Sequence, residues 1–474
     1  MKIADRNLPK LIIRIILSCL LFFQPFPGAS KAFALSAQEE RVMGEKFLIQ
    51  IRQTLDFLDD DYAQQYLNDL GQYLTRPLET RYFPFHFYLV KDNDLNAFAA
   101  PGGHIFVFSG LINEMEEIDE LAAVMCHEIA HVSARHLAHR MEQAKSLGWV
   151  PLAGLLLGIL VGGPAGAAVM AGSQAASVQA QLHYSRQDES QADQLGFKYT
   201  KASTFDPHGL IGSLNKIQKN QWIGTDKIPA YLLTHPTGSE RTSNLEIMLR
   251  DYSKGPDSRE ARRFRALFPF FKTIVRAKSV EPRDAERAFK RELEKNPDSV
   301  LAHFGLGMVW NQRSEYDLAI EHFQKALTGQ PNSVPILRNL GKAYQMKGQD
   351  EKALRTLEKA LKADRQDRST LFLLAVSYQN QEKYEKAIGL YERLALTNSA
   401  KGQVYYNLGV SYGRVGKLAL AHYNFGIYFR RFGRREKAIF HFEKAWVLAK
   451  NDPALRGRIQ KAMKGLQRRG SKEN

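Results

Sequence analysis

Residues 127–131 read His-Glu-Ile-Ala-His, in which two histidines four residues apart enclose a glutamate. On an α-helix, residues four apart lie on one face, so the imidazoles of His127 and His131 can bind one metal ion. Glu128 lies about 100° further round the helix, where its carboxylate can take a proton from a water molecule held by that ion. The spacing therefore predicts a catalytic zinc site that hydrolyses peptide bonds.

The segment around this motif, residues 118–140, has the composition of a buried helix. It contains neither glycine nor proline, and its apolar residues recur at helical spacing. We expect His136 and His139 to continue this helix as ordinary surface residues. Two core histidines beside a surface glutamate are the alternative interpretation of the motif. The apolar positions are Leu121, Val124, Met125, Ile129 and Val132.

A catalytic zinc ion needs a third protein ligand and one open position. The metzincin continuation HExxHxxGxxH is absent, because Ala134 and Leu137 stand where it requires glycine and histidine. A glutamate from a second helix is the obvious candidate, and residues 177–200 form a plausible one. Within that segment Glu189 and Asp193 are four residues apart and share a face.

The motif followed by RQDESQADQLG resembles the gluzincin peptidases that include the prenyl-protein proteases and the bacterial heat-shock membrane protease. The resemblance implies that Glu189 is the third zinc ligand and that Asp193 supports a ligating histidine. The segment NAFAAPGGHIFVFSGLI at 96–112 resembles the strand that leads into the family's active-site helix, and LLTHPTGSERTSNL at 232–245 resembles its THP segment. Together these matches cover roughly residues 40–250.

The stretch HIFVFSG, beginning at His104, is rich in β-branched and aromatic residues and follows a Pro-Gly-Gly turn, so it predicts a β-strand. As an exposed edge beside the zinc helix, this strand would let an extended substrate pair with it. A buried core strand without substrate contact is the alternative. We interpret His86 and His104 as structural residues.

The THP segment implies two further roles. Its similarity to the periplasmic proteases that enhance β-barrel assembly implies that His235 can occupy the open position on zinc and hold the enzyme shut, so His235 is a candidate switch. Arg241 could stabilise the oxyanion of the tetrahedral intermediate. For each residue, a structural role in the loop is the alternative.

Residues 149–172 carry no charge and have the length of a membrane span. A single span would put His131 and Glu189 on opposite sides of the membrane, although both must contact one ion. A hairpin turning at 162–164 has a first arm of about 18 Å, short of a hydrocarbon core of about 30 Å. We expect a helical hairpin or lid that packs over the cleft or makes peripheral contact with a membrane surface, with a buried core hairpin as the alternative.

A 34-residue period, typical of tetratricopeptide repeats, recurs in the second half of the chain. In such repeats small residues let paired helices approach, and large residues fill the groove between them. A half-unit at 285–297 is expected to start the array, and the helix at 417–431 to serve two units. We expect the concave face to bind peptide or a protein partner. Recurring positions include Gly307, Gly341 and Gly409; Ala319, Ala353, Ala387 and Ala421; and Trp310, Tyr344, Tyr378 and Tyr412.

The N-terminus has the pattern of an export signal, in which basic residues precede an apolar run from Ile15 to Phe23. An Ala-x-Ala pattern predicts cleavage after Ala34, and an uncleaved anchor is the alternative. Cys126 would then be the only cysteine, which excludes an intramolecular disulfide. The formal net charge of +16 favours anionic membrane surfaces or acidic clients over nucleic acid, because an exported protein rarely meets nucleic acid. A merely solvated basic surface is the alternative.

The sequence therefore predicts a mainly α fold with a small β-sheet in the zinc protease domain, followed by an all-α tetratricopeptide solenoid. The predicted order is a signal peptide at 1–34, the peptidase at 35–255, a linker with a degenerate half-repeat at 256–296, repeats at 297–450 and a basic tail at 451–474.

The expected function is that of a periplasmic endopeptidase with one Zn²⁺ per chain. The resemblance implies unfolded or misassembled outer-membrane proteins as substrates and contact with the barrel-assembly machinery through the repeats. A chaperone or scaffold with a latent or structural zinc site is the alternative, and a membrane-embedded protease is a third hypothesis. Iron or cobalt would also fit two imidazoles and a carboxylate.

Overall fold

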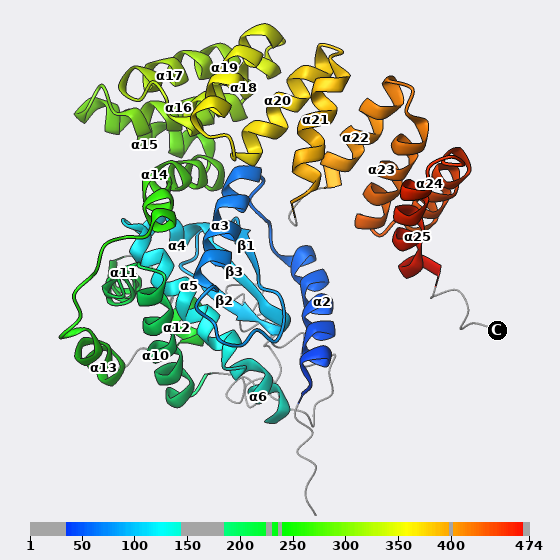
Figure 1. The fold of residues 1–474 in the computed structure, drawn as a ribbon. Helices are drawn as coiled ribbons and strands as arrows, with labels where there is room; N and C mark the ends of the chain where they lie inside the picture. Colours follow the sequence, from blue (N-terminus) through cyan, green and yellow to red (C-terminus); the bar gives the residue numbers. More distant parts are fainter. Residues whose placement is uncertain (1–34, 144–183, 224–229, 236–238, 398–401, 468–474) are drawn as a thin grey trace, which may run out of the picture.

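The computed structural model describes residues 35–143, 184–223, 230–235, 239–397 and 402–467. Within them the molecule is mainly helical with one three-stranded sheet (Figure 1), which confirms the predicted fold class. The predicted signal segment 1–34 and the apolar segment 149–172 lie outside the described residues. Among the helices that are described, none combines the length and the apolar character needed to cross a bilayer.

The sheet has the order β1-β3-β2, with β3 (His104–Phe108) in the middle. Strand β1 (His86–Val90) pairs parallel to β3, and β2 (Ala97–Ala100) pairs antiparallel to it. Every residue of β3 is buried because one face contributes to the main core and the other to a smaller core under α2 (Ala37–Thr54). The prediction of an exposed substrate edge at 104–108 is therefore wrong, and the buried alternative is confirmed. The edge strand beside the motif helix is β2.

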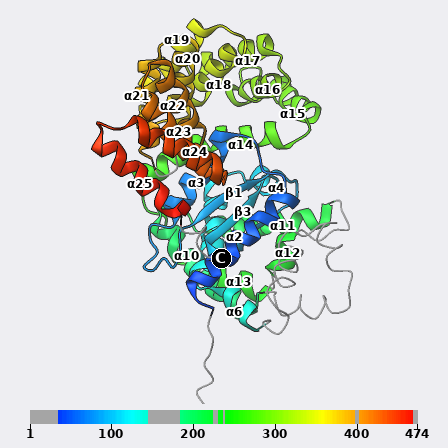
Figure 2. The same ribbon diagram turned by 90° about the vertical axis from the view of Figure 1, so that its right-hand side faces the viewer.

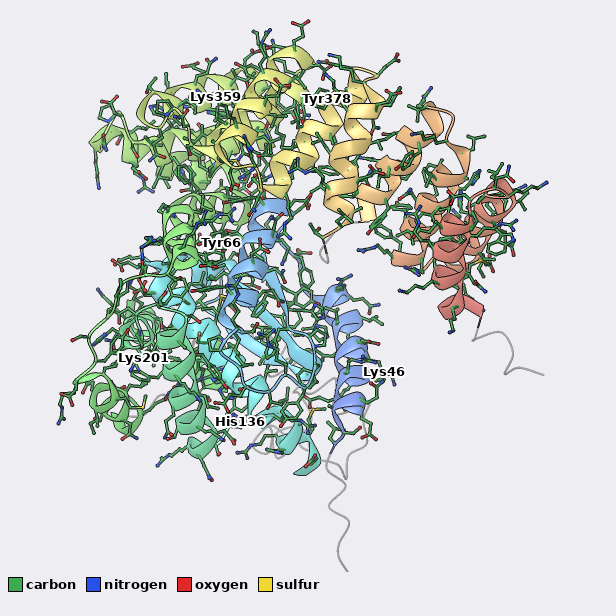
Figure 3. The ribbon with its side chains drawn as sticks, in the orientation of Figure 1. Lys46, Tyr66, His136, Lys201, Lys359 and Tyr378 are labelled. Atoms are coloured by element: carbon green, nitrogen blue, oxygen red, sulfur yellow. The ribbon has the colours of Figure 1, made fainter. Side chains whose placement is uncertain are left out.

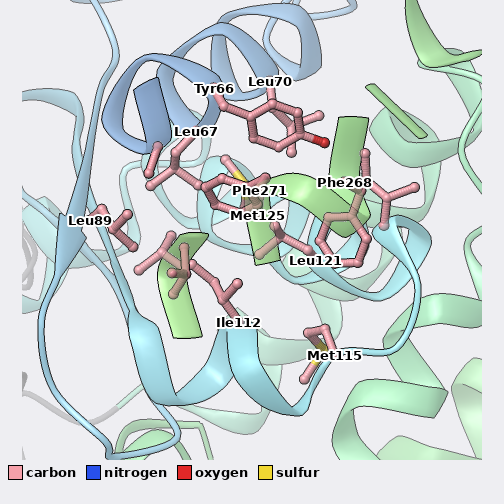
Figure 4. Packing of buried hydrophobic residues seen from close by; sticks show 14 of the residues in the cluster. Tyr66, Leu67, Leu70, Leu89, Ile112, Met115, Leu121, Met125, Phe268 and Phe271 are labelled. Carbon is pink, nitrogen blue, oxygen red and sulfur yellow. The ribbon is translucent and has the colours of Figure 1, made fainter. Parts of the chain in front are cut away.

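The main core lies between α3 (Asp61–Leu74), α5 (Ile118–Ser133) and α14 (Arg259–Ser279) (Figure 4). Tyr66 of α3 stacks on Phe271 of α14 with ring centroids 4.3 Å apart. The opposite side of α14 contacts the repeats, where Phe270 meets Phe304 edge to face. Where the sequence predicts a linker at 256–296, the structure thus has a buried helix that joins the cores of both domains.

Two helices meet closely where the motif lies. All residues of α5 from Ile118 to Val132 are buried. Helix α10 (Arg186–Ala202) begins at a capping box formed by Ser185 and Asp188. Gly196 of α10 faces the backbone of His127, and a Cβ atom there would lie 3.3 Å from the His127 Cα. The glycine therefore permits the close approach that brings α10 onto the motif.

The C-terminal half consists of paired helices that pack as the 34-residue period predicts. A Cβ atom on Gly307 would lie 2.5 Å from the Phe323 ring, and one on Gly341 would lie 2.6 Å from Leu357. The helices are α15 (Pro282–Lys295), α16 (Val300–Gln312), α17 (Tyr316–Gly329), α18 (Val334–Met346), α19 (Asp350–Ala363), α20 (Arg368–Asn380), α21 (Tyr384–Ala395), α22 (Gly402–Arg414), α23 (Leu418–Arg431), α24 (Arg435–Leu448) and α25 (Pro453–Gln467).

The two ends of the array show how its terminal helices are used. Helix α23 serves two units as predicted, because Phe425 packs over Gly409 of α22 while Gly426 receives Phe442 of α24. Where the sequence predicts a basic tail from residue 451, α25 packs against α24 and buries Leu455 among other apolar residues. This part of the predicted tail is thus a helix whose apolar residues share one face.

The repeats curve over the peptidase domain (Figure 1) and contact it through α3. The Arg368 guanidinium of α20 binds both carboxylate oxygens of Asp69 at 2.6 Å. Arg338 of α18 is buried with its guanidinium carbon 3.7 Å from the centre of the Tyr62 ring. These contacts fix the array relative to the helices that carry the site.

Candidate metal centre

Four buried side chains converge on one point of the peptidase domain: His127, His131, Glu189 and His235. Each offers one potential ligand atom, and these atoms all lie within 4.8 Å of one another. The first two come from α5 and Glu189 comes from the first turn of α10. His235 follows α12 (Ala230–Thr234), where its backbone N–H donates to the Tyr231 carbonyl at 2.8 Å. The structure thus brings together the predicted ligands and the predicted fourth ligand.

The spacing of these atoms fits a tetrahedral zinc ion. Ligands about 2.0 to 2.1 Å from zinc define a tetrahedron with edges of about 3.3 to 3.4 Å. The Nε2 atom of His127 lies 3.0 Å from His131 Nε2 and 3.4 Å from His235 Nδ1. Glu189 places its oxygens 3.4 Å from His127 Nε2, 3.5 Å from His131 Nε2 and 2.9 Å from His235 Nδ1. In this conformation His235 occupies the fourth corner.

The remaining polar atoms also fit a cation here. His235 Nε2 and both carboxylate oxygens of Glu128 are buried and have no hydrogen-bond partner among the described residues. Buried polar atoms without partners are costly and uncommon in native proteins. Two imidazoles with a carboxylate are a typical ligand set for catalytic zinc. The residues therefore fit a zinc ion held by His127, His131 and Glu189.

Asp193 lies behind His127, as the resemblance implies. Its Oδ1 atom is 3.0 Å from His127 Nδ1, the ring nitrogen that faces away from the cluster. Such a carboxylate fixes the orientation of a ligating imidazole. Burial opposes the charged form of His127, but the hydrogen bonds with Asp193 and Glu189 outweigh it and raise the His127 pKa to about 9.

Arg241 is buried between the two carboxylates of α10. Its Nε and Nη2 atoms donate to the two oxygens of Asp193 at 2.8 and 2.9 Å, and Nη1 lies 2.7 Å from Glu189 Oε2. Burial opposes ionisation of Glu189, yet the charges of His235 and Arg241 prevail and hold its pKa well below the ordinary value. Arg241 thus keeps the predicted ligand Glu189 ionised. Its predicted role at an oxyanion stays a prediction.

The structure places His136 differently from the prediction. Helix α5 ends at Ser133, and Arg135 adopts φ of 56°, so the chain turns before α6 (His136–Gln143) begins. The turn buries His136, which Figure 3 labels, and places its Nδ1 atom 3.0 Å from His131 Nδ1. Its Nε2 atom lies 2.9 Å from Gln191 Oε1. The prediction of a continuing helix with His136 on the surface is therefore wrong.

His131, His136 and Gln191 form a hydrogen-bond relay. One assignment of the ring protons satisfies both of its contacts. When His131 Nε2 binds metal, its Nδ1–H donates to His136 Nδ1, and His136 Nε2–H then donates to the amide oxygen of Gln191. This chain fixes the tautomer and the ring orientation of the ligand, as outer hydrogen bonds do in other metal sites. A second histidine five residues after His131 is the signal in the sequence that could have indicated it.

Glu128 lies beside the cluster without joining it. Its Oε1 atom is 3.4 Å from His235 Nε2. Burial raises the Glu128 pKa, against the charges of His235 and His127, and the backbone of Ala99 is among the weaker influences that lower it. Ala99 belongs to the edge strand β2. The proton acceptor therefore lies next to the strand edge where an extended chain could pair.

Two buried tyrosines, which the sequence did not single out, pack on the imidazoles. Tyr184 lies 3.9 Å from the His131 ring and 5.2 Å from the His235 ring, and Tyr231 stacks on His235 at 4.5 Å. Neither hydroxyl has a hydrogen-bond partner among the described residues. These rings exclude water from the cluster and hold His235 in place.

A helix with two histidine ligands, a second helix with a glutamate ligand and a neighbouring proton acceptor define a metallopeptidase domain. Residues 61–249 match the model of peptidase family M48, and residues 277–401 match the cytochrome c-type biogenesis protein H TPR domain. The N-terminal part of the chain thus matches an M48 metallopeptidase domain, and the C-terminal part matches a tetratricopeptide domain.

Similar proteins are found among bacterial and mitochondrial proteases. The chain is 35% identical over 223 residues to a beta-barrel assembly-enhancing protease from Yersinia pestis, covering 46% of each chain. A putative beta-barrel assembly-enhancing protease from Vibrio cholerae is 29% identical over 301 residues, covering 62% of this chain and 61% of the relative. Mitochondrial metalloendopeptidase OMA1 from Arabidopsis thaliana is 32% identical over 157 residues, covering 33% and 30%. The chain thus matches about half the length of its bacterial relatives.

Proposed function

We propose that this chain is a zinc-dependent endopeptidase of the periplasm that degrades misassembled outer-membrane β-barrel proteins and assists their assembly. The observation that carries the proposal is the tetrahedral spacing of His127, His131 and Glu189 next to a buried Glu128. The names of the bacterial relatives support the link to barrel assembly. The predicted signal at 1–34 supports export.

Zinc in this site would supply Lewis-acid chemistry, polarising the peptide carbonyl and acidifying water. The chain's own residues supply the proton transfers and the positioning. Glu128 takes a proton from the attacking water and passes it to the leaving amine, a task for which a raised carboxyl pKa is suited. The edge strand β2 would hold an extended substrate segment beside Glu128.

Arg241 is the proposed partner of the oxyanion. In the described conformation Asp193 and Glu189 occupy its guanidinium. Stabilising a reacting carbonyl would therefore require part of this pairing to loosen. The same pairing gives Arg241 a second role, because it positions the ionised carboxylate of Glu189 at the cluster.

His235 is proposed as the switch that keeps the site shut. Its Nδ1 atom fills the corner of the tetrahedron that water must occupy during hydrolysis. Release of the segment after α12 would open that corner.

The test of the function compares the purified chain with Glu128→Gln and His235→Ala on an unfolded outer-membrane β-barrel protein. We expect Glu128→Gln to retain zinc and lose cleavage by about 10²- to 10⁴-fold, the usual contribution of a general base. We expect His235→Ala to cleave faster than the wild type. Substantial cleavage by Glu128→Gln would remove Glu128 from its proposed role.

The alternative is a repeat-based chaperone or scaffold whose zinc site is latent. The closed corner at His235 is the observation that favours it. Complementation of a null strain separates the two functions, because a scaffold carrying Glu128→Gln would rescue the strain and a peptidase would not. Carbonate washing tests the remaining hypothesis, since a membrane-embedded protease would resist release.

A further inference from the structure

The end of the repeat array, α23–α25, is strongly basic. Residues 418–467 contain eleven basic and three acidic residues, a net charge of +8 out of the +16 of the whole sequence. Figure 2 turns these helices toward the viewer, at the end of the array. We call this unit the basic cap. Its cations are Arg430, Arg431, Arg434, Arg435, Lys437, Lys444, Lys450, Arg456, Arg458, Lys461 and Lys464.

One face of α24 combines two lysines with exposed apolar side chains, and the exposed carboxylates of Glu436 and Glu443 border it. Phe440, Val447 and Leu448 are 52%, 57% and 47% exposed. With Lys437 and Lys444, they recur at intervals of three and four residues, so all five lie on one stripe of the helix. We call these five residues the α24 stripe.

The stripe is not the face that holds α24 in the array. That face consists of Ala438, Phe442 and Ala445, which are buried against the neighbouring helices and lie on the opposite side of α24. Substitutions in the stripe therefore leave the packing of the repeat intact.

The lysines and the apolar side chains of the stripe are mixed rather than segregated. The Lys437 ammonium lies 5.6 Å from the centre of the Phe429 ring, and that of Lys444 lies 5.9 Å from the centre of the Phe440 ring. Neither lysine forms an ion pair with a described residue. Exposed Phe432, at the turn between α23 and α24, extends the apolar surface.

We propose that the basic cap docks on the surface of a membrane that contains anionic phospholipids, with the α24 stripe inserted among the headgroups. Interleaved lysines and apolar side chains are suited to this boundary, because the cations bind lipid phosphates while the apolar groups leave water. A second copy of the chain is a poor occupant, because two caps of net charge +8 repel each other.

The experiment measures binding of the purified full chain to vesicles of phosphatidylcholine alone and of phosphatidylcholine with phosphatidylglycerol in equal parts. We expect binding only to the second set, weakened by added salt. The double variant Lys437→Glu with Lys444→Glu should lower the partition coefficient by about tenfold or more. Phe440→Ser with Val447→Ser should also weaken binding, with the dependence on salt retained.

The matched control is Lys359→Glu with Lys362→Glu on α19, which makes the same change of charge at exposed positions; Figure 3 labels Lys359. We expect this control to bind almost as well as the wild type, and circular dichroism checks that all variants fold. Equal loss in the α19 and α24 variants would overturn the proposal, because attraction would then follow net charge alone. Binding to polyglutamate without binding to anionic vesicles would also overturn it and assign the cap to an acidic protein.

Discussion

The metal cluster gathers polar side chains from α5, α10 and the segment after α12, whereas each helix of the repeats packs mainly on the next helix along the chain. In the cluster, one displaced residue changes the surroundings of every other. In the repeats, the same contact between a glycine and a large side chain occurs in successive units, as at Gly307 and Gly341. Substitutions in the cluster should therefore abolish function, while those in the repeats should cost limited stability.

Glu189→Gln should have the largest effect, because it replaces the anionic ligand by a neutral amide of the same size. We expect loss of the bound zinc and a decrease in proteolysis of about a thousandfold or more. Metal analysis of the purified variant and a cleavage assay measure the two effects. The control is Glu79→Gln, an exposed carboxylate paired with Lys198 far from the cluster, which should behave as the wild type. Zinc bound at wild-type affinity by Glu189→Gln would contradict the proposed ligand set.

His136→Ala should have an intermediate effect, since it removes the partner of His131 without removing a ligand. Outer hydrogen bonds of this kind contribute about 10- to 100-fold to metal affinity. Competition with a zinc chelator measures the change. His139→Ala in the same helix is the control because His139 is exposed. Equal zinc affinity in both variants would show that the relay to Gln191 does not support the ligand.

The residues around the metal cluster differ in how far the sequence could predict their roles. The helical spacing of His127 and His131 places them on one face whatever surrounds the helix, so that pair was predictable. The role of His136 depends on the positive φ of Arg135, which no residue preference indicates for arginine. The pattern of strand 104–108 predicts a strand but not its place in the sheet, because strand order is set by packing of distant segments.

The repeats were easier to predict because the same packing contact recurs in successive repeats. The glycines and the large side chains recur with the helices they join, so Gly307 and Phe323 indicate their contact directly. Helix α14 has no such counterpart. Its two apolar faces pack on different domains, so its side chains follow neither the repeat nor the motif.

Gly307→Ala should produce a smaller effect, confined to stability. The new methyl group would lie 2.5 Å from the Phe323 ring, and overpacking of this kind typically costs about 1 to 3 kcal/mol. Gly389→Ala is the matched control, because a Cβ atom there meets nothing within 4 Å and alanine favours a helix by about 1 kcal/mol. Urea unfolding should show opposite signs for the two variants. Destabilisation by both would indicate that helix propensity does not dominate at open positions.

The smallest predicted effect is a dependence of repeat stability on pH. Burial, then the charges of nearby His303 and Lys325, lower the pKa of His322 to about 4 from 6.5. Between these values the unfolded chain binds more protons than the folded chain. Stability is therefore complete above pH 6.5 and falls as the pH decreases toward 4, by about 1 kcal/mol after allowance for solvent screening.

His322→Gln should remove this part of the loss, because glutamine does not titrate. The measurement is urea unfolding of the wild type and the variant at neutral pH and near pH 5, comparing the change in unfolding free energy between the two conditions. His139→Gln, at an exposed position in the peptidase domain, corrects for the loss of one histidine as such. A wild type and a His322→Gln variant that lose equal stability on acidification would show that burial and the nearby charges do not keep His322 neutral. Such a result would also sharpen the contrast drawn above, since the stability of the repeats would then owe nothing to this polar contact.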